Sequence, residues 1–311
     1  MSLDQRIRDA EHRLFTREGV QPEETFTEAG DGVRVRVLNF GIGPSVVLLH
    51  GVGLTAAIWV PWLRELAGYR LQLVELPGHG LSDPVTYRRG AVRDHSVAFV
   101  DGLLDALGLE TAPVIGHSLG GMLALWHAAT RPGRISSLVA IGEPAVALPG
   151  ATVRMPLSLM TVPVVGEIML RCPAPRSVFR TMLGQGLSPA AAAAVSDDLL
   201  DVLRLASTRK GNAGTVASLM HAINAFRQPR PESVMTDREL GQISVPVSFI
   251  LGRGDPFLTP ELARPSIAKI PHAVLHEVSG GHGPWLEEPE LCARLVIGHL
   301  TETGTTRQLD V

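Results

Sequence analysis

The clearest structural pattern in the chain is Val114-Ile115-Gly116-His117-Ser118-Leu119-Gly120-Gly121. It predicts a short apolar strand that turns directly into a helix, because the apolar pattern continues at helical spacing through residues 122–126. Such a corner holds Ser118 in a strained conformation, and the glycines two positions to either side remove Cβ atoms that would clash there. Ser118 then projects outward, beside the free N–H groups of a helix start, as a candidate nucleophile. Taken alone, residues 116–120 also fit a glycine-rich turn with an incidental serine.

The composition is that of a globular chain with a sizeable core. The 311 residues are 45% hydrophobic and 19% charged, which suits one large domain or a core domain with an insert. A formal net charge of −3, with a pI near 6.4, gives no reason to expect a nucleic-acid partner. Cys172 and Cys292 form no C-x-x-C pair, so we expect neither a structural disulfide nor a metal site. Residues 1–17 are charged throughout and no apolar run reaches a membrane-span length, so a cytoplasmic setting is expected.

Strand patterns alternate with helical patterns along most of the chain. Residues 33–38 alternate like a half-exposed strand, and 46–49 form a continuous apolar run of the kind found in a strand covered on both faces. Further strands are predicted at 71–75, 112–115, 135–141, 245–251 and 273–278. Helical spacing occurs at 4–17, 59–66 and 95–107. This alternation predicts an α/β fold with a mostly parallel sheet and helices on both faces.

One long interval departs from this rhythm. Residues 145–235 are rich in Met and Pro and poor in strand signal, and they are predicted to form a helical cap, or lid, over the sheet. Ser188-Pro189 has the form of an N-cap and first helical residue and predicts a helix to about Ala206. The remaining ranges predict an N-terminal helical extension at 1–25 and a core made of 26–144 and 236–311. Met side chains suit an adaptable apolar cavity wall, or they serve only to hold the insert together.

Three chemically active residues follow three of the predicted strands. Because ligands bind at the carboxyl ends of the strands in an open parallel sheet, the residues just after each strand are the candidates. Ser118 follows 112–115, Asp255 follows 245–251 and His282 follows 273–278. A nucleophile, an orienting carboxylate and a general base need such positions if they are to share one pocket. Glu143, at the end of 135–141, is the alternative acid.

Several motifs together resemble the α/β-hydrolase fold superfamily, of the single-domain type with a helical cap. The resemblance covers about residues 30–140 and 240–300. Besides the elbow at Ser118, its motifs are His50-Gly51, Pro77-Gly78-His79-Gly80-Leu81-Ser82, Gly252-Arg253-Gly254-Asp255 and Gly280-Gly281-His282. These motifs are specific for the fold and for the triad, and they say little about the substrate.

The resemblance implies a role for each member of the triad. Ser118 attacks the acyl carbon, His282 takes the serine proton and returns it to the leaving group, and Asp255 orients the imidazole. The backbone N–H groups of Leu119 and of Val52, or of its neighbour Gly53, would stabilise the oxyanion. No metal and no organic cofactor is required by this chemistry.

Other residues near these motifs are supporting or pocket candidates. His50, Gly51, Gly53 and His117 lie inside motifs and are expected to act structurally around the site, and His79 is expected in a structural turn. Glu143, if it is not the acid, is expected near the pocket or in a salt bridge at the base of the cap. Large aromatic residues next to the motif loops line the pocket or belong to the core; they are Trp59, Phe257 and Trp285.

The predicted triad favours acyl transfer to water. A serine nucleophile argues against epoxide hydrolase or haloalkane dehalogenase chemistry, which uses a carboxylate, and favours hydrolysis of an ester, lactone or thioester. The apolar cap favours a hydrophobic small-molecule substrate, although Arg171, Arg176 and Arg180 could pair with a substrate carboxylate. Two alternatives remain open: a carbon–carbon bond hydrolase or biosynthetic lyase or cyclase on the same triad, and a small-molecule receptor with little turnover. No sequence feature specifies an oligomeric state.

Overall fold

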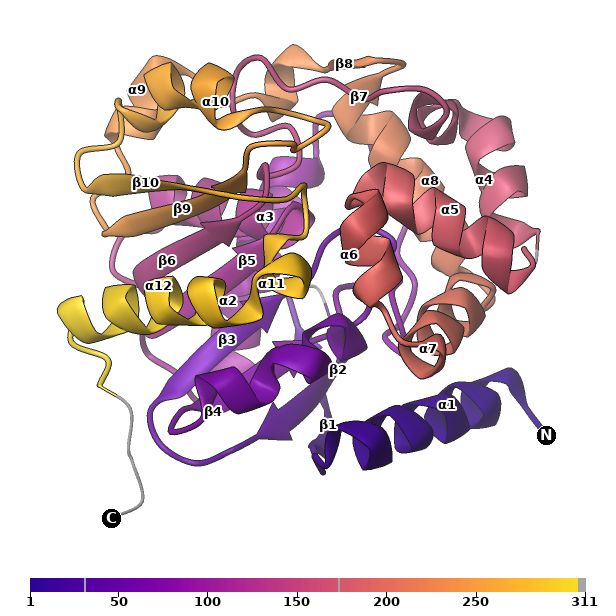
Figure 1. The fold of residues 1–311 in the computed structure, drawn as a ribbon. Coiled ribbons are helices and arrows are strands. Elements are labelled where there is room, and N and C mark those ends of the chain that lie inside the picture. The colour runs from indigo at the N-terminus through magenta and orange to yellow at the C-terminus, as the bar shows by residue number, and fades with distance from the viewer. Residues whose placement is uncertain (31, 173, 307–311) are drawn as a thin grey trace.

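An eight-stranded, mostly parallel sheet forms the centre of the computed structural model, which describes residues 1–30, 32–172 and 174–306 (Figure 1). The first two pairings, β1 with β2 and β2 with β4, are antiparallel, and all others are parallel. In spatial order the strands are β1 (Glu23–Ala29), β2 (Val33–Phe40), β4 (Arg70–Val74), β3 (Ser45–Leu49), β5 (Ala112–His117), β6 (Ile135–Ile141), β9 (Val247–Gly252) and β10 (Ala273–Val278). The predicted α/β class with a mostly parallel sheet is confirmed.

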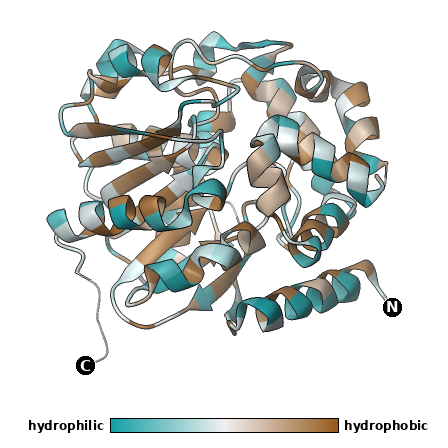
Figure 2. Ribbon diagram, viewed as in Figure 1, coloured by the Kyte–Doolittle hydropathy of each residue, from teal (hydrophilic) through white to brown (hydrophobic). Residues whose placement is uncertain are grey.

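Apolar side chains cover both faces of this sheet. Along β3, Val46 and Leu48 belong to one buried cluster and Val47 and Leu49 to the other, which is why this strand reads as one apolar run. The helices on one face are α2 (Val92–Ala106), α3 (Leu119–Thr130), α9 (Asp237–Gly241) and α10 (Pro260–Ile267). The other face carries α1 (Leu3–Glu18), the 3₁₀ helix η1 (Ala56–Leu66), α11 (Pro284–Glu287) and α12 (Pro289–Glu302). Figure 2 shows the hydrophobic strands between these amphipathic helices.

Helices make up most of the segment 145–235, which forms a group of its own beside the sheet in Figure 1. Its helices are η2 (Leu157–Thr161), α4 (Pro163–Arg171), α5 (Arg176–Gly186), α6 (Pro189–Ala194), α7 (Asp197–Ser207), α8 (Asn212–Ile223) and η3 (Pro231–Ser233). A short hairpin, β7 (Asn224–Ala225) with β8 (Gln228–Pro229), precedes η3. The single helix predicted from Ser188 to about Ala206 is wrong, because Ser196 caps a second helix by accepting a hydrogen bond from the Leu199 N–H.

The N-terminal helix α1 lies beside α7, so it connects the core to the segment 145–235 (Figure 1). Arg17 pairs with Asp198 at 3.0 Å, and Arg209 pairs with Asp4 at 3.1 Å. Strand β1 begins at Glu23, inside the range predicted as a helical extension. Among the helices of the described residues, none combines the length and the hydropathy needed to cross a bilayer.

Candidate active site

Ser118 occupies the sharp corner between β5 and α3. Its φ and ψ are 49° and −110°, a conformation that stores about 1–3 kcal/mol of strain in a residue other than glycine. A Cβ atom on Gly120 would lie 2.2 Å from the Leu49 carbonyl oxygen, and one on Gly116 would lie 2.6 Å from the Gly120 carbonyl carbon. Both positions therefore have room only for glycine. The Ser118 side chain is nearly buried and lines a cavity.

His282 and Asp255 form a direct hydrogen bond. Nδ1 of His282 lies 2.7 Å from Oδ2 of Asp255, and both side chains are buried. The backbone N–H groups of Glu143 and Phe257 donate to the same carboxylate at 2.9 Å each. Burial alone would raise the pKa of Asp255, but the His282 ring and these donors outweigh it and hold the pKa below its ordinary value. The ionised carboxylate accepts the bond, so His282 carries a proton on Nδ1, and in the neutral tautomer with this proton Nε2 is an acceptor.

Ser118 and His282 line the same cavity, and Asp255 contacts His282 on the side of Nδ1. The backbone of His282 is held at both of its polar groups. Its N–H donates to the Leu187 carbonyl at 2.6 Å, and its carbonyl oxygen lies 3.0 Å from Nε2 of His117. Within the residues that the structure describes, no direct hydrogen bond joins the Ser118 hydroxyl to the His282 ring. The serine and the histidine from separate strand ends thus meet at one cavity wall.

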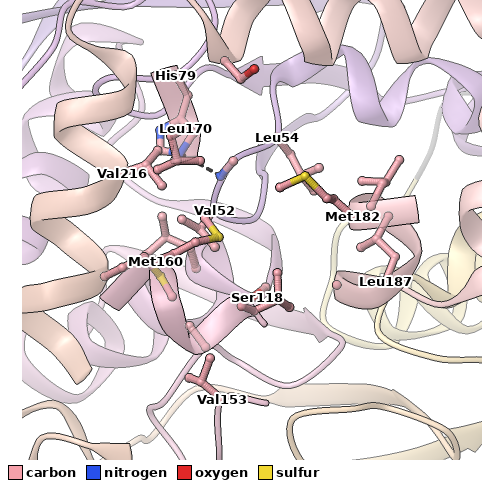
Figure 3. Close-up of a pocket in the computed structure, with 18 of the residues that line it drawn as sticks. Val52, Leu54, His79, Ser118, Val153, Met160, Leu170, Met182, Leu187 and Val216 are labelled. Carbon is pink, nitrogen blue, oxygen red and sulfur yellow. Dashed lines mark hydrogen bonds between the residues drawn. The ribbon is translucent and has the colours of Figure 1, made fainter. Parts of the chain in front are cut away.

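The backbone N–H groups of Val52 and Leu119, two residues that line the cavity, have no acceptor among the described residues. Leu119 is the first residue of α3 and so lacks a helical acceptor. The Gly53 N–H, in contrast, donates to Nε2 of His79 at 3.0 Å (Figure 3). Val52 and Gly53 are the two alternatives for the oxyanion donor from this loop, and within the described part of the chain only Val52 has a backbone N–H that is free to donate.

Three neutral histidines hold the loops around the cavity. Nε2 of His50 accepts the Leu76 N–H at 3.1 Å, and Nδ1 of His79 lies 3.0 Å from the Pro77 carbonyl oxygen. Burial lowers the pKa of His79 to about 4 and holds the pKa values of His50 and His117 well below their ordinary value. His79 and His117 line the cavity, whereas His50 does not. The sequence predicts only a structural turn for His79. The Pro-Gly-His-Gly motif around it is the available signal that this histidine lies at the site.

Gly51 also supports this region through its lack of a side chain. A Cβ atom at this position would lie 2.6 Å from Nδ1 of His117. Gly51 is therefore required for the close approach of the loop after β3 to the end of β5, and it does not line the cavity.

The aromatic pocket candidates separate into two groups. Trp59 and Trp285 are buried in the core, with ring centroids 4.8 Å apart, and neither lines the cavity. Trp285 packs edge-on against His117 at 4.6 Å, so these two tryptophans support the site from behind and follow the second of the two alternatives, the core. Phe257 does line the cavity, and its ring packs edge-on against His282 at 4.6 Å.

Glu143 lies at the cavity wall directly after β6. Its backbone N–H holds Asp255, but its side chain makes no hydrogen bond or salt bridge with any described residue. Burial, together with the negative charge of Asp255, raises the pKa of Glu143 well above its ordinary value. The structure therefore pairs His282 with Asp255 and leaves Glu143 without a partner at the base of the segment 145–235.

The cavity is large and mostly apolar. Its volume is about 210 Å³, whereas a single water needs roughly 10–15 Å³ on the same scale, so it can hold a small organic molecule. Figure 3 shows Met160, Met182 and Leu187 around Ser118. Two more of the methionines, Met169 and Met220, also line it, whereas Met155 is exposed and Met235 lies in the core. The polar groups that sequence reasoning missed are Thr55, Thr152, Ser207, Asn212 and Asn224, which belong to no motif.

The described lining of this cavity contains no Lys or Arg side chain. The three arginines considered for a substrate carboxylate are engaged elsewhere. Arg171 pairs with Glu167, Arg176 with Asp201, and Arg180 with Asp197. The described residues also contain no group of three or more His, Cys, Asp or Glu side chains arranged to hold a metal ion.

Comparison with known proteins shows the family of this chain. A model of the alpha/beta hydrolase family matches residues 46–295. A 2-hydroxy-6-oxononadienedioate/2-hydroxy-6-oxononatrienedioate hydrolase of Paraburkholderia xenovorans is 30% identical over 285 residues, which cover 87% of this chain and 92% of that protein.

Solved structures show the same fold. A carboxylesterase from Bacillus subtilis superposes with a TM-score of 0.77 at 20% identity, covering 97% of this chain and 99% of that one. A 2-hydroxy-6-oxo-6-phenylhexa-2,4-dienoate hydrolase from Rhodococcus sp. strain RHA1 superposes with a TM-score of 0.73 at 20% identity, covering 91% and 99%. With its fold, its serine elbow and the match over residues 46–295, this chain belongs to the alpha/beta hydrolase family.

Proposed function

We propose that this protein is a serine hydrolase that cleaves uncharged, apolar carboxylic esters, including lactones and thioesters, through an acyl-enzyme on Ser118. The observation that carries the proposal is the strained serine on the wall of an apolar cavity that His282 also lines. Nδ1 of His282 is hydrogen-bonded to Asp255. In this proposal the segment 145–235 is the cap that encloses the substrate.

The chemistry follows from the protonation states at the site. Nε2 of His282 removes the Ser118 proton as the serine oxygen attacks the carbonyl carbon of the ester. The developing oxyanion accepts hydrogen bonds from the Val52 and Leu119 N–H groups, each worth roughly 3–4 kcal/mol in serine hydrolases. His282 then gives the proton to the leaving alcohol, and the acyl-enzyme forms. Water, deprotonated by His282, releases the acid, while Asp255 stabilises the charged imidazolium through both steps.

An uncharged substrate is favoured by the cavity wall. A substrate carboxylate would lose its hydration there and find no Lys or Arg among the described lining residues. Burying an unpaired carboxylate costs several kcal/mol, more than the apolar contacts of a small acyl group return. The four lining methionines can adapt to acyl chains of different shape.

Carbon–carbon bond hydrolysis is the second candidate, and the names of the sequence relatives favour it over ester hydrolysis. The Paraburkholderia xenovorans relative is named for a dienedioate, a substrate with two carboxylates, and the same serine and histidine could serve such a reaction. The absence of a cation from the described cavity lining is the reason that we place esters first.

Two measurements test the proposal. The wild-type protein and Ser118→Ala are treated with a fluorophosphonate probe, and turnover is followed with p-nitrophenyl esters of increasing acyl chain length and with a 2-hydroxy-6-oxo-dienoate. We expect labelling of the wild type only, and a loss in kcat of at least roughly 10⁴-fold in Ser118→Ala. We also expect a preference for acyl chains longer than acetyl, because they fill the apolar cavity.

Other outcomes point elsewhere. Labelling that persists in Ser118→Ala would reject this serine as the nucleophile. Turnover of the dienoate with little esterase activity would replace the ester proposal with carbon–carbon bond hydrolysis. Labelling without turnover of any of these substrates would indicate a small-molecule receptor.

A further inference from the structure

Glu143 is an acidic side chain in the cavity that the proposed reaction does not use. It is 2% exposed and lines the same cavity as Ser118 and His282. Its Oε1 atom is buried and has no hydrogen-bond partner, and no described residue forms an ion pair with the carboxyl group. A buried polar atom without a partner is costly, so its presence at a ligand cavity calls for a partner that the free protein lacks.

The side chain of Glu143 is not needed to hold the catalytic carboxylate. The contact with Asp255 is made by the Glu143 backbone N–H, which any residue other than proline would supply. Asp255 already bonds to Nδ1 of His282 at 2.7 Å, so a second acid for that ring is not required. The carboxyl group of Glu143 is therefore available for a ligand.

Its protonation state decides which ligand group it can bind. Burial and the nearby charge of Asp255 raise the pKa of Glu143, so the neutral carboxylic acid is favoured. A neutral carboxyl group offers one O–H donor and an accepting oxygen, whereas an ionised one only accepts. In a cavity that is otherwise apolar, an O–H donor would discriminate between substrates that have a second acceptor oxygen and those that do not.

We propose that the Glu143 carboxyl group donates a hydrogen bond to an uncharged carbonyl or ether oxygen of the substrate, separate from the oxygen that enters the oxyanion site. The inference deepens the proposed function and rests on it, because it places this contact in the cavity that contains Ser118. It makes Glu143 a residue that determines specificity: the preferred esters carry a second oxygen within reach of the wall after β6.

The test compares esters of equal chain length with and without that oxygen. The substrates are p-nitrophenyl pentanoate, 3-methoxypropanoate, ethoxyacetate and 4-oxopentanoate, and the variants are Glu143→Leu and Glu143→Gln. The measured quantity is kcat/KM for each oxygen-bearing ester divided by kcat/KM for pentanoate, since differences in overall activity between variants cancel in this ratio. Thr152→Val, which removes another polar group from the cavity wall, is the matched control.

We expect at least one of these ratios to fall by about 2- to 12-fold in Glu143→Leu, the range for one lost hydrogen bond. Glu143→Gln should restore the ratio, because the amide keeps a donor, and Thr152→Val should leave it unchanged. Equal ratios in the wild type and Glu143→Leu would overturn the proposal, as would a Gln variant that behaves like the Leu variant. Selective loss of butyrylthiocholine turnover in both variants would show an ionised carboxylate that binds cations, and would also overturn it.

A binding measurement separates failure of this inference from failure of the esterase proposal. Calorimetric affinities of 2-octanone and of 6-methoxyhexan-2-one and its alkoxy isomers of equal chain length, such as 5-ethoxypentan-2-one, require no turnover. We expect the wild type to bind at least one alkoxy ketone more tightly, relative to 2-octanone, than Glu143→Leu does. If esters are not hydrolysed but this difference is present, the esterase proposal fails and the Glu143 contact stands. If esters are hydrolysed but neither the kcat/KM ratios nor the relative ketone affinities change in Glu143→Leu, the Glu143 contact is rejected and the esterase proposal stands.

Discussion

Arg36 donates two hydrogen bonds of 2.7 Å to the two carboxylate oxygens of Glu11. The pair joins β2 to α1, and both side chains are almost completely buried. Glu24 and Glu75 also lie beside Arg36, at 2.7 and 3.4 Å. Three carboxyl groups therefore surround one buried guanidinium where the N-terminal helix meets the sheet.

Removing Glu11 should destabilise the fold. Loss of one partner from a buried ion pair typically costs about 3–5 kcal/mol; because Glu24 and Glu75 remain beside Arg36, we expect a loss of about 2–3 kcal/mol in the free energy of unfolding of Glu11→Ala. Chemical denaturation measures this quantity, and Arg6→Ala, on the exposed face of the same helix, is the control. Equal stability of the two variants would show that the Arg36–Glu11 pair does not hold α1 in place.

Glu75 should make the stability of the protein depend on pH. Its side chain is fully buried, and burial, with the charge of Glu11 added, raises its pKa to about 7 despite the opposing charge of Arg36. Above pH 4.5 the unfolded chain releases the proton that the folded chain keeps until about pH 7, so this group lowers stability as the pH rises through that window. Glu75→Gln removes the effect.

The stability of Glu75→Gln relative to the wild type should therefore increase by about 1–3 kcal/mol between about pH 5 and pH 8. Unfolding by urea at a series of pH values measures it, with the exposed Glu110→Gln as a control that should track the wild type. A difference that stays constant or shrinks with rising pH would mean that Glu75 is ionised throughout.

His79 should affect the rate of the chemical step more than substrate binding. Because its Nε2 fixes the Gly53 N–H, it holds the loop that presents the Val52 N–H to the cavity. We expect His79→Ala to lower kcat by roughly 10- to 100-fold, less than outright loss of an oxyanion donor, with a smaller change in KM. Steady-state kinetics on one p-nitrophenyl ester measures the changes in kcat and in KM separately, and the exposed His12→Ala is the control. A change confined to KM would argue against a role for this loop in the transition state.

Much of the fold could be predicted because the buried strands leave a strong signal. The run at 135–141 coincides with the buried strand β6, since apolar side chains must cover the sheet. The run at 273–278 coincides with β10, an edge strand whose sequence is mostly apolar although most of its residues are partly exposed. Strand β1 was missed because it is an edge strand with polar, exposed residues, and its pairing with β2 gives no local pattern. The break between α6 and α7 was missed because the alanine run continues the helical spacing up to the Ser196 cap.

The site was predictable only where a motif marks it. Ser118, Asp255 and His282 follow strands, and parallel strands bring their carboxyl ends together. The positions of Trp59 and Trp285 depend instead on packing against each other, so adjacency to a motif could not decide between the pocket wall and the core. The cavity lining from the segment 145–235 depends on how separate helices pack, which no local spacing encodes.

The two acids near His282 should differ sharply in their effect on catalysis. Asp255 bonds to Nδ1 of His282 and, in the proposed reaction, stabilises the ring when it becomes charged, whereas the Glu143 side chain bonds to neither Asp255 nor His282. In Asp255→Asn the side-chain NH₂ group can face Nδ1 of His282, which favours the tautomer with the proton on Nε2. Nε2 can then no longer accept the serine proton, and we expect kcat to fall by roughly 10³- to 10⁴-fold. Glu143→Gln should reduce kcat far less on p-nitrophenyl pentanoate. Because both substitutions are nearly isosteric, the comparison isolates the ionisable oxygen, and a larger loss in Glu143→Gln would transfer the role of the orienting acid from Asp255 to Glu143.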